Sequence, residues 1–322
     1  MKGKVVYILL CLLLAACSVE PKIEKTIHEC PAPPEGRASA ICFALGDTIY
    51  VVSGRGQDGK YRSTMMSYST VSCQWTNNIN TPLEARVNGV VCCTSKAAYL
   101  GLGFNGGSIY RNESYCKDWW CFNPSEHQWK RLADFPSDKT VSAVAFGDED
   151  NIWVGFGFNG FGDELWRYSI AEDRWEAIAH QETWPKRLMA PVATACNGHF
   201  YQGTGFRRYE YSDWWEFFPS DNHWEPRASI PGKGRHNSTC AATSKSIWVI
   251  GGWHYGDSLT TGFHFEDIQR YSPEDDQWTR CGTIPCGVTE NGAACAVGNR
   301  VYFGLGENDK SEIHPHWYYI ED

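Results

Sequence analysis

A pair of aromatic residues with a fixed separation recurs five times along the chain, and this repeat limits the fold more than any other feature. In each copy a Tyr or Phe precedes a Trp by seven residues. The five pairs are Tyr68 and Trp75, Phe122 and Trp129, Tyr168 and Trp175, Phe217 and Trp224, and Tyr271 and Trp278. Repetition at this scale is typical of architectures in which each repeat forms one blade or one solenoid unit.

Each repeat also contains a short apolar run that ends at a glycine corner. The corner glycines are Gly54, Gly103, Gly157, Gly205, Gly252 and Gly306, which are 47 to 54 residues apart. That length accommodates four short strands with their turns, and no segment shows a sustained helical period. The sixth repeat opens near Thr289 and ends at Trp317-Tyr318-Tyr319-Ile320 without a closing aromatic pair.

The order apolar strand, glycine corner, variable loop, aromatic residue, turn and Trp resembles the kelch repeat over nearly the whole chain. Ile247–Gly252 carries the intact glycine pair, whereas other copies have Ser-Gly or Gly-x-Gly. The sequence G-F-N-G at residues 103–106 and 157–160, with D-W-W at 118–120 and 213–215, resembles the kelch lipoproteins of Bacteroidetes, often labelled galactose oxidase-like. The resemblance implies an all-β fold, a six-bladed kelch-type β-propeller.

The sixth blade requires an outer strand from elsewhere, because an open ring would leave an exposed sheet edge. Residues Ile23–Glu29 alternate in the manner of a strand. We therefore predict that the ring is closed by this N-terminal strand. Residues 34–322 would form the propeller, and residues 17–33 would serve as tether and ring-closing strand.

The first residues have the features of an export signal. Lys2 and Lys4 precede the apolar run Val5–Leu14, which is too short to span a bilayer. The following Leu14-Ala15-Ala16-Cys17 resembles the bacterial lipobox. This resemblance implies that the signal peptide, residues 1–16, is removed and that Cys17 carries lipid at the outer membrane of a bacterial cell envelope, on its periplasmic or surface side. An ordinary signal peptide is the alternative.

Twelve of the 14 cysteines lie beyond the export signal. Six of them fall in the apolar runs that open the blades, where a thiol packs as a small hydrophobic group; these are Cys42, Cys92, Cys93, Cys196, Cys240 and Cys295. Two pairs with turn-like spacing are the better candidates for disulfides, Cys116 with Cys121 and Cys281 with Cys286.

Basic residues recur where the blades begin, at Arg37, Arg86, Lys139, Arg187 and Arg235. Five cations around one pore mouth would attract an acidic ligand, such as a sugar acid or an acidic peptide. The alternative is that each arginine pairs with a carboxylate or carbonyl of the adjoining blade. The formal net charge of −9 gives no basic surface for nucleic acid, which we do not expect as a partner.

Polar and aromatic residues follow the glycine corners and are predicted to surround the same mouth. They are Asn105, Asn159, Arg207, Arg208, His254, Tyr255, Glu307 and Asn308, joined by His236 and Asn237 after Arg235. Amides, guanidinium groups and aromatic rings are the groups that bind sugars, although Asn beside Gly is also common in turns. We therefore predict a monomeric binding protein for a carbohydrate or protein partner, without a cofactor.

Two enzymatic alternatives follow from the resemblance. Sialic-acid mutarotases are six-bladed kelch propellers that use an acid and an arginine to open and close the sugar ring, and Glu307 is the candidate general base here. Copper radical oxidases share the scaffold but take one histidine ligand from a C-terminal domain that this sequence does not contain. His314 and His316 would form only an isolated metal pair.

Overall fold

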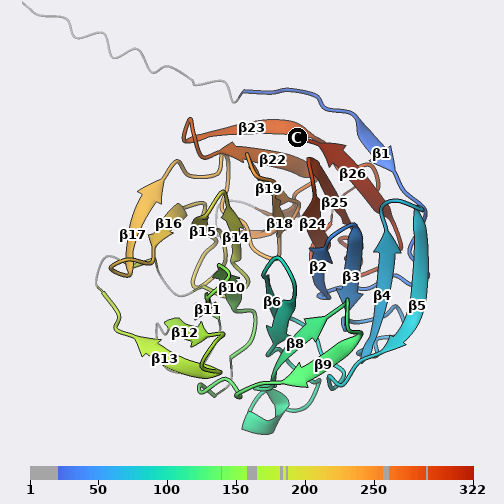
Figure 1. The fold of residues 1–322 in the computed structure, drawn as a ribbon. Coiled ribbons are helices and arrows are strands. Elements are labelled where there is room, and N and C mark those ends of the chain that lie inside the picture. The colour runs from blue at the N-terminus through green and yellow to red at the C-terminus, as the bar shows by residue number, and fades with distance from the viewer. Residues whose placement is uncertain are drawn as a thin grey trace, which may run out of the picture.

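The computed structural model describes residues 21–138, 140–157, 165–181, 184–185, 188–256, 261–287 and 289–322. Six four-stranded antiparallel sheets are arranged around a central axis, one sheet for each predicted blade (Figure 1). The chain is thus an all-β, six-bladed propeller, as the repeat predicted.

The strands can be described by their position in a blade. The innermost strands are β2 (Ile41–Leu45), β6 (Val90–Cys93), β10 (Val144–Gly147), β14 (Val192–Cys196), β18 (Thr239–Ala242) and β24 (Ala293–Val297). The second strands are β3 (Thr48–Val52), β7 (Ala98–Gly101), β11 (Asn151–Gly155), β15 (His199–Gly203), β19 (Ile247–Ile250) and β25 (Arg300–Gly304).

The outer half of each blade is built in the same order. The third strands are β4 (Thr64–Ser69), β8 (Trp119–Asn123), β12 (Leu165–Ser169), β16 (Trp214–Phe218), β22 (Asp267–Ser272) and β26 (Trp317–Glu321). The outer strands are β5 (Gln74–Asn80), β9 (Gln128–Arg131), β13 (Arg174–Ile178), β17 (His223–Arg227), β23 (Gln277–Thr283) and β1 (Ile27–Glu29).

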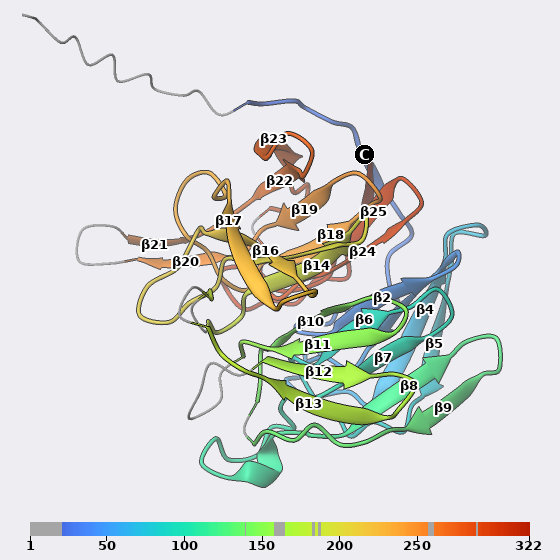
Figure 2. The same ribbon diagram turned by 60° about the vertical axis from the view of Figure 1, so that its left-hand side comes forward.

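Two further elements lie in the loops that follow the second strands. A 3-10 helix, η1 (Asn112–Ser114), belongs to the second blade, and a hairpin of β20 (Trp253–Gly256) and β21 (Thr261–His264) belongs to the fifth. Figure 2 shows the hairpin extending on the same side of the molecule as the loop with η1. Among the described residues, no helix has the length and apolarity that a membrane crossing requires.

The N-terminal strand closes the ring, as predicted. β1 pairs with β26 in antiparallel register, with Ile27 opposite Ile320 and Glu29 opposite Tyr318. The observed strand is shorter than the predicted Ile23–Glu29, because the residues before β1 lie along the outer strand of the fifth blade instead (Figure 1). There the Ile23 amide donates to Arg280 O at 2.9 Å. The N-terminal segment therefore joins the fifth blade to the sixth.

The aromatic pairs pack between blades, as their spacing predicted. Tyr168 and Trp175 are direct cross-strand neighbours on β12 and β13, with ring centroids 4.9 Å apart. Trp175 then meets Trp119 of the second blade edge to face at 5.4 Å. The same contact joins Trp278 to Trp214 at 5.3 Å. These large apolar contacts between neighbouring sheets hold the ring together.

The glycine corners are required by close backbone contacts. Gly103 has a φ of 100°, and a Cβ atom there would lie 2.5 Å from Val87 O. A Cβ on Gly306 would lie 2.5 Å from Glu290 O. Only glycine permits this approach between the end of a second strand and the segment that leads into a blade.

The two predicted disulfides are not formed, because all twelve cysteines of the described residues are free thiols. Cys116 precedes β8, and the extended strand carries Cys121 away from it. Cys281 and Cys286 instead pack separately against the apolar cluster between the fifth and sixth blades. Burial raises the pKa of both Cys116 and Cys281 to about 11.

Candidate functional site

The three described arginines among those predicted to surround the pore mouth are buried and paired. Arg37, Arg86 and Arg235 are 0 to 1% exposed. Arg86 binds Asp118 through two hydrogen bonds of 2.6 and 2.9 Å. The structure therefore contradicts a ligand-binding role that requires accessible guanidinium groups, and the alternative of pairing with carboxylates and carbonyls is the arrangement observed.

The other two arginines also bind carboxylate and carbonyl oxygens of their own blades. Arg235 binds both oxygens of Asp267, at 2.7 and 3.0 Å, and donates to Gly251 O. Arg37 donates to Thr64 O at 2.7 Å and contacts Glu35. These contacts tie the segment that leads into each blade to its second and third strands.

A backbone feature shared by the blades locates the position equivalent to the buried arginines in the other three blades. The residue two positions after Arg37, Arg86 and Arg235 has a positive φ, and the matching residues with positive φ in the third, fourth and sixth blades are Ser142, Ala190 and Asn291. The position two residues before each of them is the equivalent of the arginine position. It holds Thr140 in the third blade, Leu188 in the fourth and Thr289 in the sixth, and all three are buried. Lys139 and Arg187, the other two members of the predicted cationic ring, each come one residue before this position in the sequence, and both lie outside the described residues.

Replacing Asp267 by Asn is expected to lower the free energy of unfolding by about 3 kcal/mol at neutral pH, because it leaves the Arg235 charge buried without its counter-ion. The cost should depend on pH. Burial acts to raise the pKa of Asp267, but the charge and hydrogen bonds of Arg235 outweigh it and hold the pKa below its usual range. Denaturant unfolding of both proteins at several pH values measures the difference.

The sign of this dependence follows from the lowered pKa. The carboxylate stabilises the fold fully above its unfolded pKa of about 4, and this contribution is lost as the pH falls through the lower folded value. The difference between wild type and Asp267→Asn should therefore shrink in strong acid. Asp150→Asn, at an exposed turn, is the control; an equal cost for both substitutions would contradict the assignment.

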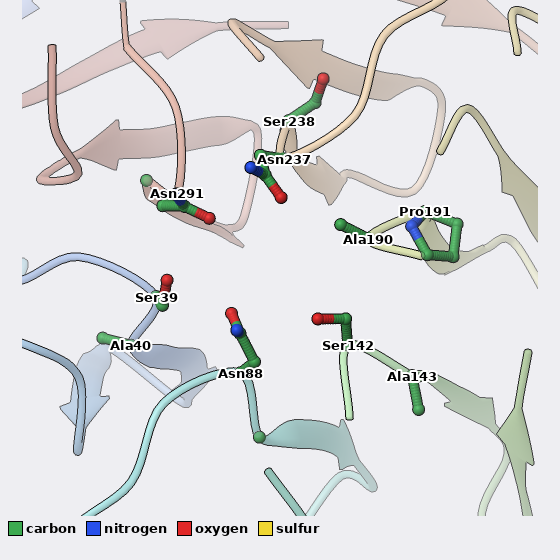
Figure 3. A pocket seen from close by; sticks show the side chains of 12 residues that line it. Ser39, Ala40, Asn88, Ser142, Ala143, Ala190, Pro191, Asn237, Ser238 and Asn291 are labelled. Carbon is green, nitrogen blue, oxygen red and sulfur yellow. The ribbon is translucent and has the colours of Figure 1, made fainter. Parts of the chain in front are cut away.

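A ring of six residues, one from each blade, lines a cavity on the central axis, and we call this ring the neck. They are Ser39, Asn88, Ser142, Ala190, Asn237 and Asn291 (Figure 3). All six have φ values between 52° and 55°. Backbone hydrogen bonds link five of them from blade to blade, from Ala190 to Asn88; for example, the Asn88 amide donates to Ser39 O at 3.1 Å and the Ser39 amide to Asn291 O at 2.8 Å.

The wall just outside the neck, which we call the mouth, is made by isolated β-bridges. Each bridge joins the residue before a neck residue to the residue after a corner glycine. The bridged pairs are Ala38 with Arg55, Val87 with Phe104, Met189 with Phe206, His236 with Trp253, and Glu290 with Glu307. The mouth is therefore apolar over the second and fourth blades and polar over the fifth, sixth and first.

An ion pair in the polar half joins the last blade to the first. Arg55 Nη2 lies 2.5 Å from Glu307 Oε2, and the Glu307 side chain is 9% exposed. The neck residue Asn291 donates its amide to the other oxygen, Oε1, at 3.1 Å. The structure thus places the predicted general base beside an arginine, in a partly desolvated position at the edge of the neck.

A second carboxylate and an aromatic ring lie next to this pair. Glu290 accepts a hydrogen bond from the neck residue Asn237 at 2.8 Å and contacts His264 Nε2 at 3.0 Å. The His264 ring stacks on Trp253, with centroids 5.4 Å apart and planes 5° apart. Carboxylates beside a flat aromatic face are the groups that bind the hydroxyls and the apolar face of a sugar ring.

The two predicted histidines share one buried carboxylate. His236 Nδ1 and His254 Nδ1 lie 3.5 and 3.4 Å from the oxygens of Glu210, whose side chain is 1% exposed. The His236 ring stands between Phe206 and Trp253, and burial lowers its pKa. His236 therefore belongs to the mouth wall as a neutral ring, whereas His254 is held behind it.

Two of the remaining predicted binding residues are described, Asn105 and Arg207. The side-chain amide of Asn105 donates to Glu113 O at 3.1 Å and to Glu84 Oε1 at 3.3 Å. Arg207 is exposed in the loop of the fourth blade, next to the bridge residue Phe206. Asn159 lies outside the described residues.

The histidine pair considered for a metal stands near a thiol. The rings of His314 and His316 are 5.3 Å apart, and the Cys286 thiol lies 4.0 Å from His314. Across the described ranges, no group of three or more His, Cys, Asp or Glu residues is arranged to hold a metal ion.

Sequence reasoning missed Arg55, Trp253 and His264. A positional signal for the first two exists, because both directly follow the second residue of a glycine corner, as Glu307 does. His264 carries no such signal, since it reaches the mouth only through the β20–β21 hairpin.

The comparisons with known proteins agree with this architecture. Residues 234–285 match the Kelch motif. The solved structure named "Structure of YjhT" superimposes with a TM-score of 0.72, covering 91% of this chain and 95% of that one at 14% identity. This likeness shows the fold, so the chain is a six-bladed β-propeller with a kelch motif in its fifth blade.

Curated relatives fall into two groups. An N-acetylneuraminate epimerase of Haemophilus influenzae (strain 86-028NP) is 22% identical, over 89% of this chain and 71% of its own length. N-acetylneuraminate epimerase 1 of Escherichia coli O6:H1 is 24% identical over 65% of this chain. Kelch-like protein 23 of Homo sapiens is 22% identical over 86% of this chain. The chain spans about half the length of the last two relatives, 50% and 47%.

Proposed function

We propose that this protein is a mutarotase for a nine-carbon sugar acid, of the N-acetylneuraminate epimerase type, acting at the mouth of the propeller. The observation that carries the proposal is the pair of Glu307 and Arg55, a partly buried carboxylate beside a guanidinium group at the edge of the neck. The relatives named N-acetylneuraminate epimerase support the same substrate class.

The chemistry requires only proton transfers. The Glu307 carboxylate takes the proton of the anomeric hydroxyl, the bond between the anomeric carbon and the ring oxygen breaks with its electron pair going to oxygen, and that oxygen takes a proton from water. The open keto form then closes on its other face, and both protons return. Arg55 would bind the sugar carboxylate, and Trp253 would pack against the ring.

The direct test is exchange NMR with N-acetylneuraminate. Catalytic amounts of the soluble domain should speed the interconversion of the two anomers well beyond the buffer rate, with the same final anomer ratio. An unchanged exchange rate at protein concentrations that bind the sugar would overturn the enzymatic proposal.

A binding role without catalysis is the second candidate, and one observation favours it. Arg55 Nη2 is already engaged by Glu307, so a sugar carboxylate must share or displace that contact. A stable ion pair of this kind suits a rigid binding surface. Measured affinity for a carbohydrate or protein partner without any acceleration of anomer exchange would support this role.

We also propose that the chain is anchored to a bacterial outer membrane through lipid on Cys17. Cys17 lies outside the described residues. The chain is attached to the propeller only four residues later, at Pro21, whose O accepts a hydrogen bond from the Arg280 amide at 2.9 Å. A tether of four residue steps keeps the propeller within about 15 Å of the lipid. The fifth blade would then be the part nearest the membrane.

Replacing Cys17 by Ser is expected to release the protein from the membrane fraction of bacterial cells, because it removes the only residue that the lipobox would acylate. Mass spectrometry of the N-terminal peptide should find acyl chains on wild type and none on the variant. Cys73→Ser, at an exposed turn, is the matched control and should leave the protein in the membrane fraction. An unmodified N-terminal peptide in wild type would contradict the anchor.

A further inference from the structure

The neck presents polar side chains that the fold does not use. Figure 3 shows Ser39, Asn88 and Ser142 directed toward a shared opening with Asn237 and Asn291. The last two are occupied by Glu290 and Glu307. Within the part of the chain that the structure describes, the side chains of the first three have no protein hydrogen-bond partner. Polar groups of this kind that line a cavity are available to a ligand or to water.

The space inside the neck is large enough for a short chain. The cavity at this level has a volume of about 160 Å³. One water needs roughly 10 to 15 Å³ by the same measure. The residues next to the ring are small, among them Ala40, Gly89 and Ala143, so nothing bulky closes the passage. A polyhydroxylated chain of three carbons fits such a space and would find hydroxyl and amide groups around it.

The neck adjoins the proposed pair of Glu307 and Arg55, because the neck residue Asn291 donates a side-chain hydrogen bond to Glu307. In a nine-carbon sugar acid, one ring oxygen connects the anomeric carbon to the carbon that bears the three-carbon polyhydroxyl tail. A sugar whose anomeric hydroxyl reaches Glu307 therefore has its tail within reach of the neck.

We propose that the neck binds the polyhydroxyl tail of the substrate, and that it selects nine-carbon sugar acids over sugar acids that have no such tail. Asn88 and Ser142 are the specificity-determining residues, because their side chains have no hydrogen-bond partner among the described residues and come from the second and third blades, whereas Glu307 belongs to the sixth. This assignment rests on the proposed function, since it needs a sugar acid at the mouth. It concerns a different part of the ligand from the part that reacts.

The test compares N-acetylneuraminate with its analogue shortened by the two terminal carbons of the tail, with the anomeric centre left intact. Wild type should favour the intact sugar in kcat/KM by about tenfold to a hundredfold, since two buried hydroxyl contacts are lost. Asn88→Gly removes an amide without straining a left-handed backbone, and it should raise KM for the intact sugar alone. Ser142→Asn narrows the neck and should act in the same direction.

Asn78→Gly is the matched control, because Asn78 has a φ of 56° and lies exposed on β5, outside the neck. Equal kcat/KM for the two sugars in wild type, unchanged by Asn88→Gly and Ser142→Asn, would show that the neck holds only water and would overturn the proposal. If wild type accelerates anomer exchange of neither sugar, the proposed mutarotase function is wrong. Calorimetry then tests separately whether the neck binds the sugar tail. Tighter binding of the intact sugar supports the tail site, and equal binding of both sugars overturns it.

Discussion

Replacing Glu307 by Gln is expected to lower the rate of anomer exchange by about 100- to 10,000-fold, the contribution that a positioned general base makes. The amide keeps the shape of the side chain but cannot accept the anomeric proton. Since Arg55 remains in place to bind the sugar carboxylate, the loss should appear in kcat, with a smaller change in KM. Exchange NMR at several sugar concentrations separates the two constants.

The control for this variant lies in the same loop of the sixth blade. Glu312 is exposed and contacts only Asn308 among the described residues, so Glu312→Gln should retain the wild-type rate. Because the Glu307 pair also links the sixth blade to the first, the thermal unfolding of both variants must be compared. A Glu307→Gln protein that is folded and fully active would remove this residue from the mechanism.

The propeller could be predicted because its determinants are local and repeated. Tyr271 and Trp278 are seven residues apart because they are cross-strand neighbours joined by a tight turn, and this geometry returns in blade after blade. The closing strand was predictable from the deficit in the sixth repeat. The exact path of the residues before this strand could not be predicted. Their hydrogen bonds to Arg280 depend on how the fifth and sixth blades pack against each other.

The function of the arginines depended on partners that a local pattern does not show. An arginine at the start of a blade is equally compatible with ligand binding and with a buried ion pair inside the blade. The sequence does contain a signal for the ion pair, because Arg86 precedes Asp118 and Arg235 precedes Asp267 by the same 32 residues. Equal separation in two repeats indicates an internal contact rather than a ligand.

The candidate site was predicted in part for a related reason. Glu307 follows a glycine corner and could be singled out on that ground alone. Its partner Arg55 is 252 residues away in the sequence, and only closure of the ring brings the first and last blades together. The aromatic wall of Trp253 and His264 depends likewise on a hairpin that has no counterpart in the other described loops.

Removing the N-terminal segment up to Cys30 is expected to lower the free energy of unfolding by roughly 5 kcal/mol, since about half a dozen backbone hydrogen bonds would be lost at ~1 kcal/mol each. These bonds join Ile23 and Lys25 to the fifth blade and β1 to β26. The sixth blade would keep three strands, and the backbone of β26 would become an exposed edge that promotes aggregation.

Thermal unfolding and light scattering compare a chain that starts at Pro31 with one that starts at Pro21. The shorter chain should unfold roughly 10 °C earlier or more, and it should self-associate. The longer chain is the control, because it retains Ile27 against the apolar cluster of the last two blades. A synthetic peptide of residues 21–30 should restore the shorter chain in a concentration-dependent way, because it binds only the folded ring. Equal stability of the two monomers would show that the ring closes through its blade contacts alone.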